Sequence, residues 1–304
     1  MPFDPETFRV AGKDLLDHLF KSLFDPTLSW SPLPAARQQR AKHASATAAF
    51  DAVTRPEIEK LLAEMVDPAM SVKSGRLPGS LFEVLIRTDS RFVQGSTEAL
   101  VAEARVFINA GFETTAHSLA FTLGLLAENK LQQDRCAAEA RRTCGKGKRR
   151  PTRQAVREGG LEVNYGAFME SCRLFPLAPV ITGLSTGAID VTTEDGRAYR
   201  IPANSSVLAF NGVVQRCNIP QPDDFVPDRW SSSSRDKPYL ATFNRGAHAC
   251  PGKPLSVLEA QVILPMVLDR FVFDFPEGVE KMESVEDLLV RPMNKGALVV
   301  RRRG

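Results

Sequence analysis

The stretch Phe243-Asn-Arg-Gly-Ala-His-Ala-Cys-Pro-Gly252 places Cys250 between two glycines, directly ahead of an apolar run with helical spacing. The dipole and the unpaired backbone N–H groups at the start of a helix favour an ionised thiol. Gly246 and Gly252 let the backbone turn sharply and let a large flat ligand lie against it. The pattern predicts a thiolate at Cys250, covered from water by Phe243, with His248 able to hydrogen-bond an acidic group of the ligand. Cys250 alone also fits the alternative of a small buried hydrophobic residue.

The composition indicates a globular chain without a strong charge bias. Its 304 residues are 43% hydrophobic, which is enough for one large domain or two small ones, and the net charge is only +3. This balance does not favour nucleic acid as a partner. The five cysteines contain no Cys-x-x-Cys pair, so a reducing compartment fits better than a disulfide framework or a zinc site. No signal peptide or transmembrane segment is apparent, and the chain as given is expected to be soluble.

A long helix is predicted from residue 97 to about 129, and its interior reads Ala110-Gly-Phe-Glu-Thr114. Gly111 costs such a helix about 1 kcal/mol relative to alanine, which suggests a local role. Ala110, Gly111 and Thr114 would form a shallow groove that a flat cofactor and a diatomic ligand can approach. Thr114 can donate a hydrogen bond to bound oxygen, and Glu113 can relay protons through water. A tight helix crossing, with the threonine bonding back to a carbonyl, is the alternative.

A second helix is predicted over residues 165–175, where Pro176 stops it. Glu170 and Arg173 are three residues apart and therefore share one face of this helix. Such a pair is commonly a weak surface salt bridge, but its neighbours are mostly apolar, which favours partial burial.

The spacing Phe-x-x-Gly-x-His-x-Cys-x-Gly resembles the haem-binding loop of the haem-thiolate monooxygenases, the cytochromes P-450. The resemblance extends from about residue 97 to the end through four motifs in the family's order. They are the oxygen-side helix, the Glu-x-x-Arg pair, the Phe-x-Pro-x-Arg-Trp segment at 225–230 and the cysteine loop.

The resemblance implies a set of site residues. Cys250 would be the axial ligand of the iron of haem b, whose thiolate favours O–O cleavage, and Glu113 with Thr114 would be the acid-alcohol pair. The other cofactor-binding positions would be Phe243, Gly246, His248, Gly252, Ala110 and Gly111. A structural network would join Glu170, Arg173 and Arg229, and the substrate pocket would include Phe107, Ala178, Pro179, Val180 and Ile181. The segment Gln215-Arg216 and onward departs from the family's usual His-Arg-Asp-Pro.

The fold class implied is mainly α with small β-sheets, an α+β arrangement like that of cytochromes P-450 but truncated at the N-terminus. We expect one domain over residues 1–304, with a helical covering segment at 1–95 and the haem-binding core at 97–304. In full members, several strands of the main sheet and a helix that binds the haem propionates come earlier in the chain, and the covering segment is expected to begin beyond all of them.

Several local features complete the prediction. Residues 11–24 and 41–65 read as helices, residues 188–193 and 197–201 as a hairpin, and residues 271–275 and 297–301 as strands. The arginines at 301–303 read as a solvated tail, and the histidines at 18, 43 and 117 as isolated. Breaks are expected at the prolines at positions 26, 32, 34, 56, 68 and 78.

The function implied is reductive activation of O₂ at haem iron and insertion of one oxygen atom into a small apolar organic substrate by hydroxylation or epoxidation. Electrons would come from NAD(P)H through a flavoprotein reductase or a ferredoxin. Two alternatives remain: a non-catalytic haem-binding remnant or scaffold, and a haem-thiolate isomerase or dehydratase, which generally lacks the acid-alcohol pair. Full-length microsomal relatives would be anchored in the endoplasmic reticulum, and the location of this chain is left open.

Overall fold

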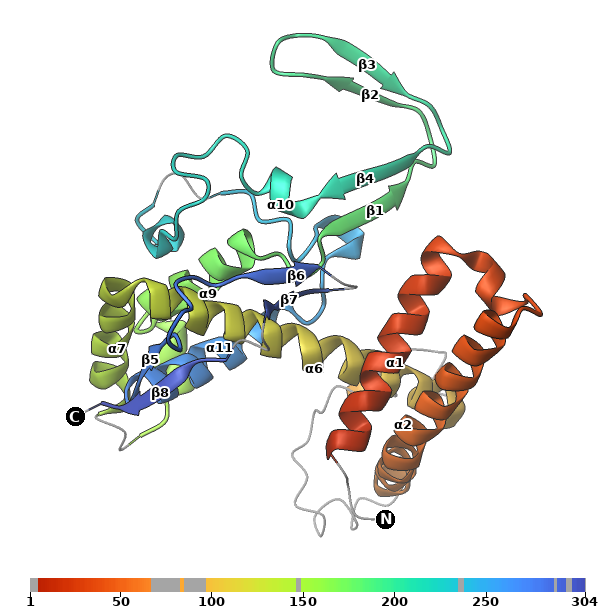
Figure 1. Ribbon diagram of the computed structural model, residues 1–304, viewed down its shortest axis with the longest axis horizontal. Coiled ribbons are helices and arrows are strands. Elements are labelled where there is room, and N and C mark those ends of the chain that lie inside the picture. Colours follow the sequence, from red (N-terminus) through yellow and green to blue (C-terminus); the bar gives the residue numbers. More distant parts are fainter. Residues whose placement is uncertain are drawn as a thin grey trace. The chain divides into compact units, whose positions relative to one another are not determined.

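Helices are the main secondary structure in the computed structural model (Figure 1), which describes residues 5–66, 83–84, 97–145, 149–234, 238–286, 289–293 and 297–303. The chain divides into two compact units, Met1–Glu113 and Thr114–Gly304, whose boundary falls inside helix α6 (Thr97–Glu128). The single domain expected from the sequence stays a prediction. Among the described residues, no helix is both long enough and apolar enough to cross a membrane.

The first unit is a helical hairpin with the beginning of α6 against it. Helices α1 (Pro5–Phe24) and α2 (Pro34–Val66) pack together, joined by the 3-10 turn η1 (Pro26–Ser29). Phe50 is only 1% exposed and lies in a cluster with Ala11, Leu15 and Ala46, against which Ile108 of α6 packs. The two predicted helices are therefore confirmed, and both are longer than expected.

The break predicted at Pro56 is wrong, because α2 continues through it. A proline inside a helix removes one backbone donor and costs about 3 kcal/mol. Packing on both sides keeps the helix in one piece here: Phe50 is buried before the proline, and Ile58 is buried after it against Leu100 and Val101 of α6. Pro26 and Pro34 do begin new elements, and positions 68 and 78 lie outside the described residues.

The description of His18 and His43 as isolated is also wrong. Their rings, one from α1 and one from α2, lie 4.2 Å apart between centroids at an interplanar angle of 31°. The Ser22 hydroxyl lies 3.4 Å from His18 Nε2. The two histidines are far apart in the sequence, so the sequence alone does not predict this contact. They meet because α1 and α2 fold back on each other as a hairpin.

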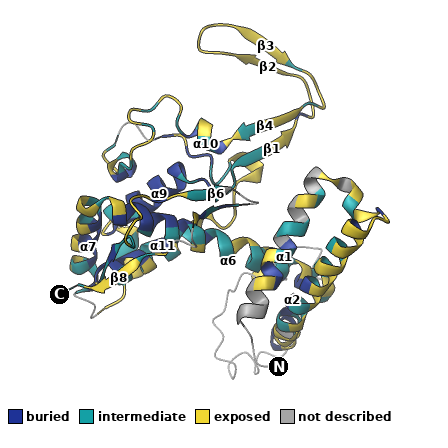
Figure 2. Cartoon of the chain, viewed as in Figure 1, coloured by how far each residue is buried: buried dark blue, intermediate teal, exposed yellow. Residues whose placement is uncertain are grey.

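The second unit packs the rest of α6 with α7 (Lys130–Cys144), α9 (Glu162–Leu174) and α11 (Lys253–Leu268). The short helices α8 (Arg153–Arg157) and α10 (Asn211–Val214) connect these elements. Figure 2 shows α9 as largely buried, and its Phe168 shares a core with Leu126, Trp230 and Leu264. On α11, Ala260, Leu264 and Leu268 are buried in this core, whereas Leu255 and Leu258 are exposed.

Helix α9 begins at Glu162, three residues before the predicted start, and Glu139 of α7 explains the difference. Leu161 at the N-cap makes no side-chain cap. The Glu139 carboxylate accepts hydrogen bonds from the backbone N–H groups of Val163 and Asn164, each at 2.9 Å, and from Asn164 Nδ2 at 2.7 Å. A buried carboxylate from a neighbouring helix thus satisfies donors that a helix start leaves without partners.

The described residues form four two-stranded antiparallel sheets. Strand β1 (Val180–Leu184) pairs with β4 (Ser206–Phe210), and β2 (Ile189–Thr192) pairs with β3 (Ala198–Ile201) as the predicted hairpin. Strand β5 (Phe271–Asp274) pairs with β8 (Val299–Arg302), and β6 (Ser284–Glu286) with β7 (Val290–Pro292). The fold is therefore mostly helical with small sheets, which confirms the predicted class.

The prediction of a solvated arginine tail is confirmed for Arg301 and Arg302, which are exposed, and is wrong for Arg303, which is half-buried. Arg301 belongs to β8, and its Nη2 lies 2.6 Å from Asp274 Oδ2 on β5. The Arg303 guanidinium is 15% exposed and donates to Asp134 Oδ1 of α7 at 2.8 Å. Acidic partners contributed by remote segments hold the end of the chain against the second unit.

Candidate haem-thiolate site

The cysteine loop is closed by a backbone hydrogen bond in which the Cys250 N–H donates to the Phe243 carbonyl at 2.8 Å. Asn244 and Gly246 have positive φ values of 52° and 65°, and a short 3-10 turn, η3 (Gly246–His248), follows. Glycine at 246 suits this left-handed backbone, which strains residues that carry a Cβ. Residues 243–250 therefore form a sharp, closed loop at the position where the sequence predicts a turn.

Cys250 is a free cysteine, and its side chain is exposed. It lies three residues before α11, whose N-cap is Gly252. Phe243 is half-buried and packs against the main core, and Lys253 Nζ lies 5.5 Å from the centroid of its ring. The packing of the phenyl ring anchors the loop to the core, and the role of Phe243 in covering the sulfur stays a prediction.

The loop residues fit a haem iron. A Cβ added at Gly246 meets no atom within 4 Å, and one added at Gly252 meets Cys250 Sγ at 3.7 Å. Apart from the adjoining residues of the chain, no protein atom other than the Cys250 sulfur itself would lie within 4 Å of a Cβ at either glycine. A soft thiolate suits an iron centre, and His248 is exposed on the same loop. The donor chemistry and the free space both match a flat iron-containing cofactor.

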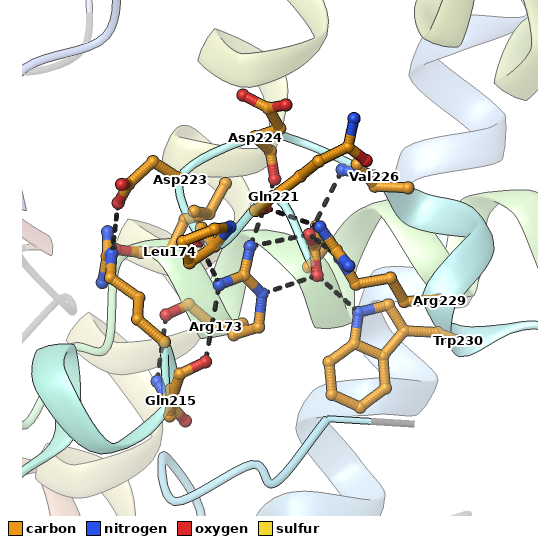
Figure 3. A network of polar contacts seen from close by, with 12 residues as sticks. Arg173, Leu174, Gln215, Gln221, Asp223, Asp224, Val226, Arg229 and Trp230 are labelled. Atoms are coloured by element: carbon orange, nitrogen blue, oxygen red, sulfur yellow. Dashed lines mark hydrogen bonds and ion pairs between the residues drawn. The ribbon is translucent and has the colours of Figure 1, made fainter. Parts of the chain in front are cut away.

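The residues predicted to form a structural network are brought together in the interior (Figure 3). Arg173 donates from Nη2 to Glu170 Oε1 at 2.8 Å and from Nε to Oε2 at 2.9 Å, and both side chains are fully buried. Arg229 Nε donates to Oε1 at 3.2 Å. The paired guanidinium groups compensate the charge of a carboxylate that has been taken out of water.

Further partners complete this network. Arg173 also donates to the backbone carbonyls of Pro222 at 2.6 Å and Asp224 at 3.1 Å (Figure 3). Trp230 Nε1 donates to Glu170 Oε2 at 2.8 Å. The role of Trp230 was missed, although the residue ends the matched 225–230 segment and an indole N–H is a donor that needs a partner when buried. The network therefore ties the irregular chain at 222–230 to α9.

The oxygen-side residues all lie on α6. Ala110 and Gly111 are exposed, a Cβ added at Gly111 meets nothing within 4 Å, and Phe107 is half-buried. Glu113 is the last residue of the first unit and Thr114 is the first residue of the second, and both are half-buried. The small-residue surface expected at 110–111 is present, and its position opposite the cysteine loop stays a prediction.

The four apolar residues at 178–181 form an extended, half-buried segment that leads into β1. Asn211 holds it from the start of α10, because its Nδ2 donates to the Ala178 carbonyl and its backbone N–H donates to the Pro179 carbonyl, each at 2.8 Å. Val180 and Ile181 pair with β4. The extended conformation agrees with the sequence, and the role of these residues as a pocket lining stays a prediction.

A mostly helical core, a closed loop presenting a cysteine and a buried Glu-Arg-Arg network are the features that the resemblance to the cytochromes P-450 predicts. The family model for cytochrome P450 matches residues 5–300. The chain therefore belongs to the cytochrome P450 family, a family of monooxygenases.

Individual relatives support the same assignment. The chain is 27% identical to cytokinin hydroxylase of Arabidopsis thaliana over 81% of its own length and 48% of the relative, and 26% identical to secologanin synthase 1 of Catharanthus roseus over 88% and 52%. It is similar in fold to a crystal structure of a mutant cytochrome P450DA heme domain, with a TM-score of 0.72 and 23% identity, over 98% of this chain and 61% of that one. The chain thus spans about half the length of these curated relatives.

Proposed function

We propose that this chain carries the iron-ligating part of a haem-thiolate monooxygenase, with Cys250 as the axial ligand. The observation that carries the proposal is the exposed Cys250 side chain on a loop closed by its own backbone hydrogen bond to Phe243. Membership of the cytochrome P450 family supports haem as the cofactor.

The haem, when bound, supplies the reductive activation of O₂, with electrons from NAD(P)H through a flavoprotein reductase or a ferredoxin. In this proposal the Cys250 thiolate donates to the iron, and Gly246 and Gly252 leave the cofactor face unobstructed. His248 hydrogen-bonds an acidic group of the cofactor. The Phe243 ring holds the loop to the core through its packing.

On the oxygen side, Ala110 and Gly111 leave room for the cofactor and for O₂. With haem bound, the Thr114 hydroxyl would be the hydrogen-bond donor on this side, and the Glu113 carboxylate would relay protons through water. These roles follow from the match of residues 110–114 to the acid-alcohol motif, and from the open space next to Gly111.

The substrate proposed is a small apolar organic molecule that is hydroxylated or epoxidised. The family resemblance assigns Phe107 and the segment Ala178, Pro179, Val180 and Ile181 to the substrate pocket, and all five side chains are apolar and half-buried. The relatives include a cytokinin hydroxylase and a secologanin synthase, so family membership is compatible with different substrates. A haem-thiolate isomerase or dehydratase is disfavoured by the Glu113-Thr114 pair.

The test is the carbon-monoxide difference spectrum of the reduced, haem-reconstituted protein. A thiolate-type Soret band in the wild type that disappears in Cys250→Ala supports the proposal. Cys217→Ala is the matched control, because Cys217 is also exposed but lies outside the loop, and this variant should keep the band. Absence of haem uptake by the wild type would instead favour a non-catalytic scaffold.

A further inference from the structure

We propose that Gln215 is a positioning residue that fixes the start of the cysteine loop to the C-terminal end of α9. The inference rests on the proposed function in one respect, since the loop matters for chemistry because Cys250 is taken as the iron ligand. The hydrogen bonds that carry the inference belong to the protein alone.

Gln215 directly follows α10, and it is 1% exposed. Its Nε2 donates to two carbonyls at the end of α9, that of Arg173 at 3.0 Å and that of Cys172 at 3.4 Å. The last carbonyls of a helix have no partner within the helix. The amide nitrogen of Gln215 therefore satisfies acceptors that α9 itself leaves open.

The other half of the same amide group reaches the segment that enters the loop. Gln215 Oε1 accepts from the backbone N–H groups of Ala241 at 2.8 Å and Thr242 at 2.9 Å. The Thr242 hydroxyl lies 2.9 Å from Oε1 and 2.7 Å from the Cys172 carbonyl, and its single proton serves one of them at a time. Both ends of the amide are thus fully used.

Residues 241 and 242 are the fixed end of the cysteine loop. Thr242 directly precedes Phe243, whose carbonyl accepts from the Cys250 N–H, and the Ala241 carbonyl accepts from the Asn244 N–H at 2.8 Å. Hydrogen bonds therefore join α9 to Gln215 and Gln215 to Thr242, and Thr242 is bonded covalently to Phe243, the first residue of the loop that presents the cysteine.

The backbone of Gln215 also touches the buried ion network. Arg173 Nη1 lies 3.5 Å from the Gln215 carbonyl and donates to it weakly (Figure 3). The same arginine holds the Glu170 carboxylate. Gln215 thus has its main chain at the network and its side chain at the loop, so it links the two structures that family resemblance singled out separately.

These hydrogen bonds offer a physical reason why this chain has Gln215-Arg216 where the family usually has the His-Arg of His-Arg-Asp-Pro. A neutral imidazole has one donor and one acceptor, whereas a glutamine amide has two donors and two acceptor lone pairs. Gln215 uses this larger capacity to satisfy two carbonyls and two N–H groups at once. A glutamine at this position can therefore support a meander that differs in sequence from the usual one.

The first test measures amide hydrogen exchange in the haem-free protein and compares Gln215→Ala with Gln133→Ala. Gln133 is a matched control because it is also 1% exposed and its amide also bridges an α-helix to a separate segment: Nε2 donates to the carbonyls of Leu126 and Phe273, and Oε1 accepts from the Phe273 N–H. Its bridge joins the end of α6 to β5, away from the cysteine loop in sequence.

In Gln215→Ala the N–H groups of residues 241–250 should exchange about tenfold faster or more, because two of them lose their acceptor. Gln133→Ala should accelerate exchange at β5 and leave residues 241–250 unchanged. Equal acceleration of residues 241–250 in the two variants, or unchanged exchange there in Gln215→Ala, overturns the inference.

The second test uses the spectrum of bound haem to report whether Cys250 ligates the iron. Gln215→Ala should lower the fraction of the reduced carbon-monoxide complex that shows the thiolate-type band, at equal haem content, and Gln133→Ala should not. Gln215→His keeps one donor and one acceptor, so it should recover part of the band and part of the slow exchange even if the alanine variant folds poorly. An identical band in wild type, Gln215→Ala and Gln133→Ala contradicts the inference.

The two proposals fail in different ways. A wild type that takes up no haem defeats the monooxygenase proposal, and the exchange experiment still decides whether Gln215 holds the loop. A wild type with a thiolate band, together with a Gln215→Ala variant whose exchange and spectrum are unchanged, defeats only the positioning role.

Discussion

Arg173 meets the carboxylate of Glu170 with two parallel hydrogen bonds of 2.8 and 2.9 Å in a region where neither side chain is exposed to solvent. Such a pair is weak evidence for net stability, because both charges have lost their hydration. Removing only one partner is a different matter, since it leaves the other charge buried alone.

Glu170→Ala should therefore lower the free energy of unfolding by about 3–5 kcal/mol in urea titrations, because it strands the Arg173 charge. Asp190→Asn is the surface control: it breaks the ion pair with Arg200, in which both side chains are more than two-thirds exposed, and should change stability by less than about 1 kcal/mol. Similar losses in both variants would show that burial does not set the cost.

Glu139→Gln tests the remote cap of α9. The variant places an NH₂ group where a carboxylate accepts the backbone N–H groups of Val163 and Asn164, so it should cost about 1–3 kcal/mol and speed amide exchange at these two residues. Glu158→Gln, an exposed carboxylate near the end of α8, is the control and should change neither. Unchanged exchange at residues 163 and 164 in Glu139→Gln would contradict the capping role.

The contact between His18 and His43 predicts a pH-dependent stability of the first unit. Burial lowers the pKa of His43 below 6.5, and the neighbouring charges of His18 and Arg105 act in the same direction. The unfolded chain then binds more protons than the folded one as the pH falls through about 6.5, so folding weakens toward acid by up to about 1.4 kcal/mol per pH unit.

His43→Asn should flatten this dependence between about pH 8 and pH 5, because it removes the group with the lowered pKa. The measurement is the urea midpoint of wild type and variant at several pH values, with unfolding of the helical hairpin followed by exchange at α1 and α2. His248→Asn is the control, since His248 lies on the cysteine loop of the second unit, and unfolding of the helical hairpin in this variant should follow the wild type. Parallel profiles for wild type and His43→Asn would rule out the His43 effect.

The sequence allowed prediction of those features that depend on residues close together in the chain. The long helix α6, the Glu170 and Arg173 pair and the hairpin of β2 with β3 all follow from local periodicity or short spacing. The features that were missed or wrong depend on remote contacts. Pro56 stays helical because Ile58 packs on α6, and Gln215 acts on residues 26 and 27 positions away. No local pattern encodes these partners.

Thr114→Ala distinguishes the catalytic interpretation of the α6 motif from a purely structural one. If the Thr114 hydroxyl hydrogen-bonds oxygen at the haem, the variant should keep haem binding and the thiolate band, while more NAD(P)H is consumed per product and more hydrogen peroxide is released. Coupling is measured as product formed per NAD(P)H oxidised, in haem-loaded protein supplied with a reductase.

Thr122→Ala is the matched control on the same helix. Its hydroxyl is buried and donates to the Ser118 carbonyl at 2.7 Å, which is the structural alternative considered for Thr114. Loss of this bond should change stability by about 1 kcal/mol and leave coupling unaffected. Only a hydroxyl that reaches the reacting atoms can change the coupling. If Thr114→Ala and Thr122→Ala both keep the coupling of the wild type, the Thr114 hydroxyl has a structural role in the helix, like that of Thr122.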